Sequence, residues 1–192
     1  MKKLYIIGGC NGAGKTTASY TILPDILDCE EFINADEIAR GLSPFNPDKA
    51  KIEAGRIMLK KIKSFIDAGK SFSFESTLAT KSYFNIIERA KDEGYETTCI
   101  FFWLSSPELA ISRVKQRVKE GGHDIPVNVI KRRYKNGIAN FFDFYEETVD
   151  SWVFINNSNK KQEIIAEGGS NQLDVYNTAI WNEIKKQLNE YS

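Results

Sequence analysis

A glycine-rich segment near the N-terminus carries the clearest chemical signal in this sequence. Residues 9–17 match the pattern G-x-x-x-x-G-K-[ST], whose backbone N–H groups surround phosphates. In this pattern Lys15 reaches the β- and γ-phosphates of a nucleoside triphosphate, and the Thr16 hydroxyl takes one position on Mg²⁺. A chance glycine-rich turn is the alternative, but an apolar run precedes the segment and helix-compatible residues follow it. The residues predicted to bind ATP or GTP are Gly9, Asn11, Gly12, Ala13, Gly14, Lys15, Thr16 and Thr17.

Asp36 is the first carboxylate with a catalytic interpretation. It follows a short predicted strand at residues 31–34, which places it beside the phosphate-binding loop. There it could accept the proton of a substrate hydroxyl that attacks the γ-phosphate. It could equally cap the turn at residues 37–40, and spacing alone leaves both roles open.

Glu75 ends a third predicted strand, at residues 71–75, and precedes Ser76 and Thr77. It could hold a substrate hydroxyl or a metal-bound water, with Ser76 or Thr77 assisting; an exposed strand end is the alternative. The fourth predicted strand ends without an acid, in Ser105-Ser106-Pro107. Many motor and transport ATPases need an acid there, so acids after the second and third strands favour a small-molecule kinase.

Four arginines flank the glycine-rich loop 120–126. Arg113 and Arg117 are four residues apart and share one face of a predicted helix, and Arg132 and Arg133 stand on the next helix. Arginines beside a flexible loop could close over the nucleotide and stabilise charge on the transferring phosphoryl group. A solvated helix face with glutamate partners is the alternative for any one of them. We expect Arg117 first and Arg133 second to be catalytic.

Two further segments have weaker interpretations. The single histidine, His123, could contact nucleotide or substrate, but the turn composition around it explains the segment equally well. The Asn156-Asn157-Ser158 segment follows the fifth predicted strand, where an adenine could rest.

Strand and helix patterns alternate along the whole chain. Strands are expected at 3–8, 31–34, 71–75, 98–104, 152–155 and 164–166, with helices at about 14–23, 46–69, 81–93, 106–121, 127–148 and 173–189. Strands that alternate with long helices indicate an α/β fold of the P-loop type, with a mainly parallel sheet of five to six strands between helices. We expect one domain over residues 1–192, with a lid-like segment around 113–135. The carboxyl ends of parallel strands share one edge, which would gather Gly9, Asp36, Glu75 and Ser105.

Composition and charge narrow the function classes. The 192 residues include 26 basic and 26 acidic side chains, a balance that gives no support for a broad nucleic-acid or membrane surface. No stretch approaches the length of a membrane span. The three scattered cysteines, at positions 10, 29 and 99, do not form a disulfide framework or a zinc motif. A reduced, cytoplasmic location is therefore the default expectation.

Together these segments resemble the zeta-toxin family of P-loop kinases. The matching segments are residues 8–17, 33–39, 74–78, 121–126 and 132–134. The resemblance implies an ATP- or GTP-dependent kinase, and in the characterised toxins the acceptor is a UDP-N-acetylated amino sugar phosphorylated on a sugar hydroxyl. It implies phosphate and Mg²⁺ binding by Lys15 and Thr16, a base at Asp36, acceptor binding by Glu75 and Thr77, and transition-state charge on Arg117 and Arg133. An antitoxin protein is suggested as a partner by the resemblance alone.

Three functions remain open, and one is favoured. The favoured function is transfer of the γ-phosphate to a hydroxyl of a small molecule, with a nucleotide sugar as the expected acceptor. A nucleotide-dependent switch or ATPase module that regulates a protein partner is the alternative from another class. Phosphorylation of polynucleotide 5′-hydroxyls is the third, and the neutral net charge disfavours it.

Overall fold

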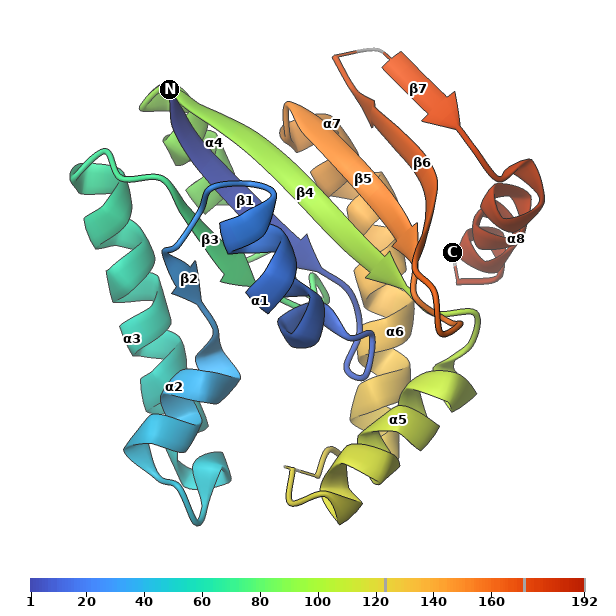
Figure 1. The fold of residues 1–192 in the computed structure, drawn as a ribbon, viewed down its shortest axis with the longest axis horizontal. Helices are drawn as coiled ribbons and strands as arrows, with labels where there is room; N and C mark the ends of the chain where they lie inside the picture. Colours follow the sequence, from blue (N-terminus) through green and yellow to red (C-terminus); the bar gives the residue numbers. More distant parts are fainter. Residues whose placement is uncertain (123, 171, 192) are drawn as a thin grey trace.

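A twisted central sheet forms the middle layer of the molecule (Figure 1). This computed structural model describes residues 1–122, 124–170 and 172–191. Within them the strands run in the order β2-β3-β1-β4-β5-β6-β7. The five strands from β2 to β5 pair in parallel, and β6 and β7 pair antiparallel at one edge. The strands are β1 (Lys2–Gly8), β2 (Phe32–Ile33), β3 (Phe72–Glu75), β4 (Tyr95–Trp103), β5 (Ser151–Asn156), β6 (Glu163–Gly169) and β7 (Gln172–Val175).

Helices connect the parallel strands and cover the sheet. Helix α1 lies over one face, and α4 and α6 lie over the other (Figure 1). Helix α3 flanks the β2 edge, where Phe65 contacts Phe72 of β3 with ring centroids 5.5 Å apart. The helices are α1 (Lys15–Asp25), α2 (Ala35–Leu42), α3 (Pro47–Asp67), α4 (Phe84–Asp92), α5 (Pro107–Lys119), α6 (Val127–Asn140), the π-helical turn η1 (Phe141–Tyr145), α7 (Glu146–Thr148) and α8 (Thr178–Tyr191).

Strand β4 forms the centre of the core because it is apolar on both faces. Its Phe101 stacks on Phe154 of β5 at 4.7 Å and contacts Phe141 of η1 at 5.2 Å. Phe102, one residue later, points to the opposite face and is also buried. A strand covered on both faces shows this continuous apolar run, so the sequence pattern correctly predicted a central strand here.

The α/β fold with a mainly parallel sheet is confirmed, but its C-terminal edge differs from the prediction. Residues 172–175 form β7, which pairs antiparallel with β6, so the last helix begins at Thr178 and not at 173. The sheet therefore has one strand more than the upper prediction of six. Strand β7 has only four residues, the first three of them exposed, which is too short a segment to distinguish a strand from a helix start.

Two local predictions near the N-terminal half were also wrong in detail. Helix α1 continues through Pro24 to Asp25, because a proline in the last turn removes only one hydrogen bond. The segment after β2 forms a complete helix, α2, where only a turn was expected. Its apolar residues do follow the helical repeat, at Ala35, Ile38, Ala39 and Leu42, but its eight residues are fewer than the window over which such a repeat is normally recognised.

The carboxyl ends of the parallel strands converge on one edge of the sheet (Figure 1). The phosphate-binding loop follows β1, α2 follows β2, and Glu75 ends β3. In the described part of the chain, no helix combines the length and apolar character needed to cross a membrane.

Candidate functional site

The loop between β1 and α1 adopts a conformation that depends on glycine. Gly9 has φ +132°, and a Cβ there would overlap the backbone oxygen of Phe102. Gly14 has φ +82° and stands directly before α1, where a Cβ would overlap the Asn157 amide. The loop thus lies against the ends of both β4 and β5. Its residues face a cavity of about 360 Å³.

The cavity collects six of the eight residues predicted to bind nucleotide. It is lined on the loop side by Asn11, Gly12, Gly14, Lys15, Thr16 and Thr17. Gly9 and Ala13 do not line it: Gly9 lies against Phe102, and buried Ala13 accepts a hydrogen bond from Asn157 Nδ2 through its carbonyl oxygen at 2.7 Å. Gly9 and Ala13 therefore contact the ends of the neighbouring strands and not the cavity.

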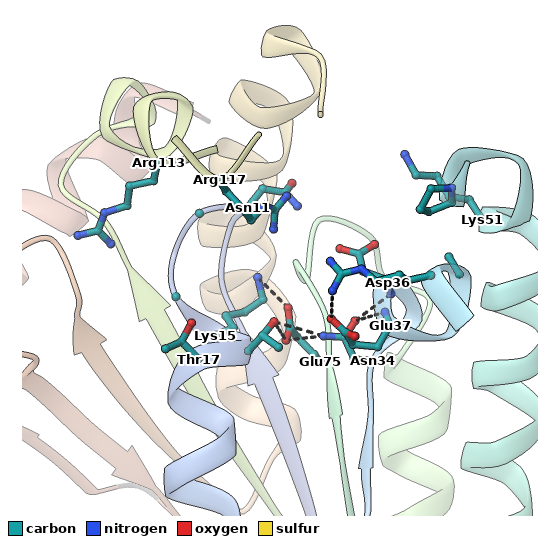
Figure 2. A pocket seen from close by; sticks show the side chains of 16 residues that line it. Asn11, Lys15, Thr17, Asn34, Asp36, Glu37, Lys51, Glu75, Arg113 and Arg117 are labelled. Carbon is teal, nitrogen blue, oxygen red and sulfur yellow. Dashed lines mark hydrogen bonds and ion pairs between the residues drawn. The ribbon is translucent and has the colours of Figure 1, made fainter. Parts of the chain in front are cut away.

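Lys15 and Thr16 are held by Glu75 at the base of the cavity (Figure 2). Lys15 is only 5% exposed; its Nζ donates to the Cys10 carbonyl oxygen at 3.0 Å and lies 3.5 Å from Glu75 Oε1. The Thr16 hydroxyl donates to Glu75 Oε2 at 2.6 Å. The predicted alternative of an exposed end for β3 is therefore wrong for Glu75, because its carboxylate joins the two residues expected at phosphate and metal.

Asn34, not Asp36, caps helix α2. The Asn34 side-chain oxygen accepts hydrogen bonds from the backbone N–H groups of Asp36 at 2.8 Å and of Glu37 at 3.3 Å. The interpretation of Asp36 as a cap is therefore incorrect, because the asparagine two residues earlier already bonds those orphan N–H groups. The Asp36 side chain lines the cavity opposite the loop (Figure 2).

The four arginines occupy different positions. Arg113 and Arg117 of α5 line the cavity, and Arg113 Nη2 donates to the Ser158 carbonyl oxygen at 3.0 Å. Arg133 of α6 reaches the loop by donating from Nη1 to Asn11 Oδ1 at 3.0 Å. Arg132 is exposed. The structure therefore brings three of the four cations to the loop.

The pKa of Arg133 is affected by the nearby carboxylate of Asp36. Burial lowers the pKa of Arg133, the carboxylate of Asp36 opposes this effect, and the charge of Arg132 adds to it. An arginine remains protonated despite such a shift, so a cation and a carboxylate face each other across the site. Burial also raises the pKa of the Cys10 thiol to about 11, which leaves it neutral at physiological pH.

Some predicted residues lie away from the cavity. Thr77 does not line it, and its carbonyl oxygen lies against Gly137 of α6, where a Cβ would be 2.6 Å away. Ser105 is likewise outside; its backbone N–H donates to Ser158 Oγ at 2.8 Å. His123 falls outside the described residues.

Several cavity residues were not predicted from the sequence. Most come from α2 and the start of α3, because a helix was not expected after β2; these are Asn34, Glu37, Ala39, Arg40, Pro47 and Lys51. Asn34 carried the one usable signal, since an asparagine between a strand and an acidic segment is typical of a helix N-cap. Within this group, the Glu37 carboxylate pairs with Arg40 Nη1 at 3.3 Å.

The donor set at the base of the cavity fits Mg²⁺. No group of three or more histidine, cysteine or acidic side chains with metal-binding geometry occurs in residues 1–122, 124–170 and 172–191. Mg²⁺ in phosphoryl-transfer sites, however, uses one or two protein oxygens together with phosphates and waters. Donation of the Thr16 proton to Glu75 leaves hydroxyl lone pairs available, and the Glu75 carboxylate supplies nearby negative charge. These are hard oxygen ligands of the kind that Mg²⁺ prefers.

Solved structures share this fold. A chain from the PezAT chromosomal toxin-antitoxin system of Streptococcus pneumoniae superposes with a TM-score of 0.68, at 15% identity over 100% of this chain and 87% of that chain. The AvrRxo1-ORF1:-ORF2 structure with ATP gives 0.75 at 15% identity, covering 96% of this chain and 63% of that chain. At these identities the likeness establishes the fold alone, an α/β fold with a mostly parallel central sheet.

Sequence comparison identifies the family. The family description "Zeta toxin" matches residues 1–170, which is most of the chain. This protein therefore belongs to the zeta toxin family. An uncharacterised protein of Haemophilus influenzae is 33% identical over 126 residues, which cover 66% of this chain and 88% of that protein.

Proposed function

We propose that this protein is a phosphotransferase that moves the γ-phosphate of ATP or GTP to a hydroxyl of a small molecule. The observation that carries the proposal is the shared cavity, which Lys15 and Thr16 line from one side and Asp36 from the other. A carboxylate on the wall opposite the loop can receive the proton of an acceptor hydroxyl that is bound between the two walls. Membership of the zeta toxin family supports the same conclusion.

The phosphate-binding side supplies positive charge at fixed positions. Lys15 would hold the β- and γ-phosphates, with loop amides and the N-terminus of α1 around them. Thr16 would hold Mg²⁺ directly and Glu75 through water, and the ion would neutralise charge on the phosphates. Arg117, which lines the cavity, and Arg133, which donates to Asn11 of the loop, would stabilise charge on the transferring group.

Asp36 is the proposed general base. Its carboxylate would accept the proton of the acceptor hydroxyl as that oxygen attacks the γ-phosphorus. One P–O bond forms to the acceptor while the bond to the bridging β,γ-oxygen breaks, and the nucleoside diphosphate leaves. Asp36 lines the cavity opposite Lys15, and this position supports an acceptor hydroxyl that lies between Asp36 and the γ-phosphate.

The acceptor would bind against α2 and the start of α3. That wall carries Glu37, Arg40 and Lys51, and their charged groups suit a polar acceptor. A nucleotide sugar, the acceptor implied by the family resemblance, offers hydroxyls for Glu37 and phosphates for Arg40 and Lys51. An antitoxin protein is proposed as a partner, by analogy with the toxin-antitoxin system that contains a chain of the same fold.

A metabolite extract tests the proposed activity. The protein is incubated with magnesium and ATP in the extract, and mass spectrometry detects small molecules heavier by one phosphate. Such species are expected with the wild type and absent with Lys15→Ala, because that variant loses the charge that holds the phosphates. ATP hydrolysis without any phosphorylated product, stimulated by an added protein, would favour the switch alternative. Transfer of phosphate to the 5′-hydroxyl of an added oligonucleotide would favour a polynucleotide kinase.

A further inference from the structure

Asn34 occupies a central place between the two sides of the cavity. It follows β2 directly, and its side chain is only 7% exposed. Figure 2 shows it beside Glu75, below Asp36 and Glu37. A buried primary amide has two donors and one acceptor to satisfy, and an unsatisfied one is costly. The partners of Asn34 therefore show what the residue does.

The two ends of the Asn34 amide bind different elements. Its Nδ2 donates to Glu75 Oε2 at 2.9 Å and lies 3.3 Å from the Thr16 hydroxyl, at the phosphate-binding side. Its Oδ1 accepts from the backbone N–H of Asp36 at 2.8 Å and of Glu37 at 3.3 Å, at the start of α2. A single planar group thus connects the phosphate-binding loop, the end of β3 and the first turn of α2.

We propose that Asn34 is a positioning residue that fixes the distance between Asp36 and the phosphate-binding loop. The inference rests on the proposed function, in which Asp36 must face the γ-phosphate bound at Lys15. Because the amide is rigid, α2 cannot shift relative to Glu75 without breaking a buried hydrogen bond. Asn34 itself touches neither reacting oxygen nor phosphorus; it acts through Asp36.

Capping alone does not require an asparagine at this position. A cap needs only an oxygen acceptor, which serine supplies equally well, whereas the bond to Glu75 needs the Nδ2 donor. Asn177 provides a matched comparison remote from the cavity. Its Oδ1 accepts from the backbone N–H of Ile180 in α8 at 3.1 Å, and its Nδ2 donates to Glu163 at 2.7 Å.

The test replaces each asparagine with serine, which keeps a capping oxygen and removes the donor. For Asn34→Ser we expect turnover at saturating ATP to fall about 100-fold, because a displacement near 1 Å has that effect on an aligned reaction. The dissociation constant of ATP should stay within about twofold, because Lys15 and the loop remain. Asn177→Ser should change neither quantity, and both variants should melt at similar temperatures.

A second readout does not depend on turnover. Hydrogen exchange is followed in a peptide covering α2, with and without magnesium and a non-hydrolysable ATP analogue. In the wild type, analogue binding at the loop should slow exchange in α2 through Asn34; in Asn34→Ser only the loop should be slowed. If the wild type shows no transfer, the proposed function fails while this readout still decides the inference. Equal slowing in both proteins, or wild-type turnover by Asn34→Ser, would overturn it.

Discussion

Three of the basic side chains at or beside the cavity are held by hydrogen bonds or ion pairs with other residues of the protein. Lys15 contacts the Cys10 carbonyl oxygen and Glu75, Arg113 binds the Ser158 carbonyl oxygen, and Arg133 binds Asn11. Side chains that are held before the substrate arrives lose little freedom on binding and present their charge in fixed directions. This organisation is typical of sites that stabilise developing charge.

The arginines provide the first prediction at this scale. Replacing Arg117 or Arg133 with alanine should lower the transfer rate at saturating ATP, by about 10²–10³-fold for at least one of them, because charge on the moving phosphoryl group loses a partner. Arg132→Ala serves as the control, since this exposed neighbour should retain the wild-type rate. Near-full activity in both Arg117→Ala and Arg133→Ala would refute the catalytic assignment of these residues.

At the residue scale, sequence reasoning depended on residue types that have one main use in a fixed pattern, and the binding roles assigned in this way stay predictions. The phosphate-binding loop was recognised because its glycines, lysine and threonine follow a fixed pattern. The position of Asp36 in the cavity follows from the strand-end rule, although its catalytic role stays a prediction. The pairing of Glu75 with Lys15 and Thr16 could not be predicted, because it depends on the register between β1 and β3.

At the scale of elements, the segment after β5 supports the phosphate-binding loop. Asn157 donates from its side chain to the Ala13 carbonyl oxygen, and its backbone N–H donates to the Trp103 carbonyl oxygen at 2.9 Å. The loop, β4 and β5 are therefore tied together at their carboxyl ends. The sequence suggested only that this segment could lie near an adenine, because a contact between residues 13 and 157 leaves no local pattern.

Asn157→Ala should weaken nucleotide binding. Loss of the hydrogen bond to Ala13 leaves one side of the loop unsupported. A hydrogen bond of this kind contributes about 1 kcal/mol, which corresponds to about a fivefold rise in the dissociation constant of ATP. Titration calorimetry would measure the change. Asn159→Ala, two residues away and exposed, should bind ATP as the wild type does. Equal affinity of both variants for ATP would show that the hydrogen bond from Asn157 to Ala13 does not hold the loop in its nucleotide-binding conformation.

At the scale of the whole molecule, the starts of β4 and β5 are joined by a partly buried polar contact. Asp150 Oδ2 accepts from the backbone N–H and the hydroxyl of Thr97 at 2.8 and 2.9 Å, and Lys91 pairs with Oδ1 at 3.0 Å. Burial alone would raise the pKa of Asp150, but these donors outweigh it and lower the pKa below its usual value.

This shift gives a pH prediction with a definite sign. A carboxyl whose pKa is lower in the folded state stabilises the fold above its unfolded pKa, and that stabilisation is lost as the pH falls through the folded value. The melting temperature of the wild type should therefore exceed that of Asp150→Asn most at neutral pH, and the difference should shrink below about pH 4. Asp25→Asn, at an exposed carboxyl, is the control. A constant difference from pH 7 to pH 3 would contradict the assignment.

The overall architecture was predictable because the alternation of strands and helices determines it, whereas its edges were not. The apolar run of β4 and the long helices marked the parallel core, which needs burial on both faces. Strand β7 has only four residues and is largely exposed, so its pattern does not distinguish a strand from the start of a helix. Helix α2 has an apolar repeat, but it extends over only eight residues.

The most direct test of the central claim is the rate of phosphoryl transfer by Asp36→Asn at saturating ATP, using the acceptor that the metabolite extract identifies. If Asp36 is the base, transfer should fall by about 10²–10⁴-fold while the dissociation constant of ATP stays within about twofold of the wild-type value. Transfer at the wild-type rate would contradict the account and remove Asp36 from the mechanism.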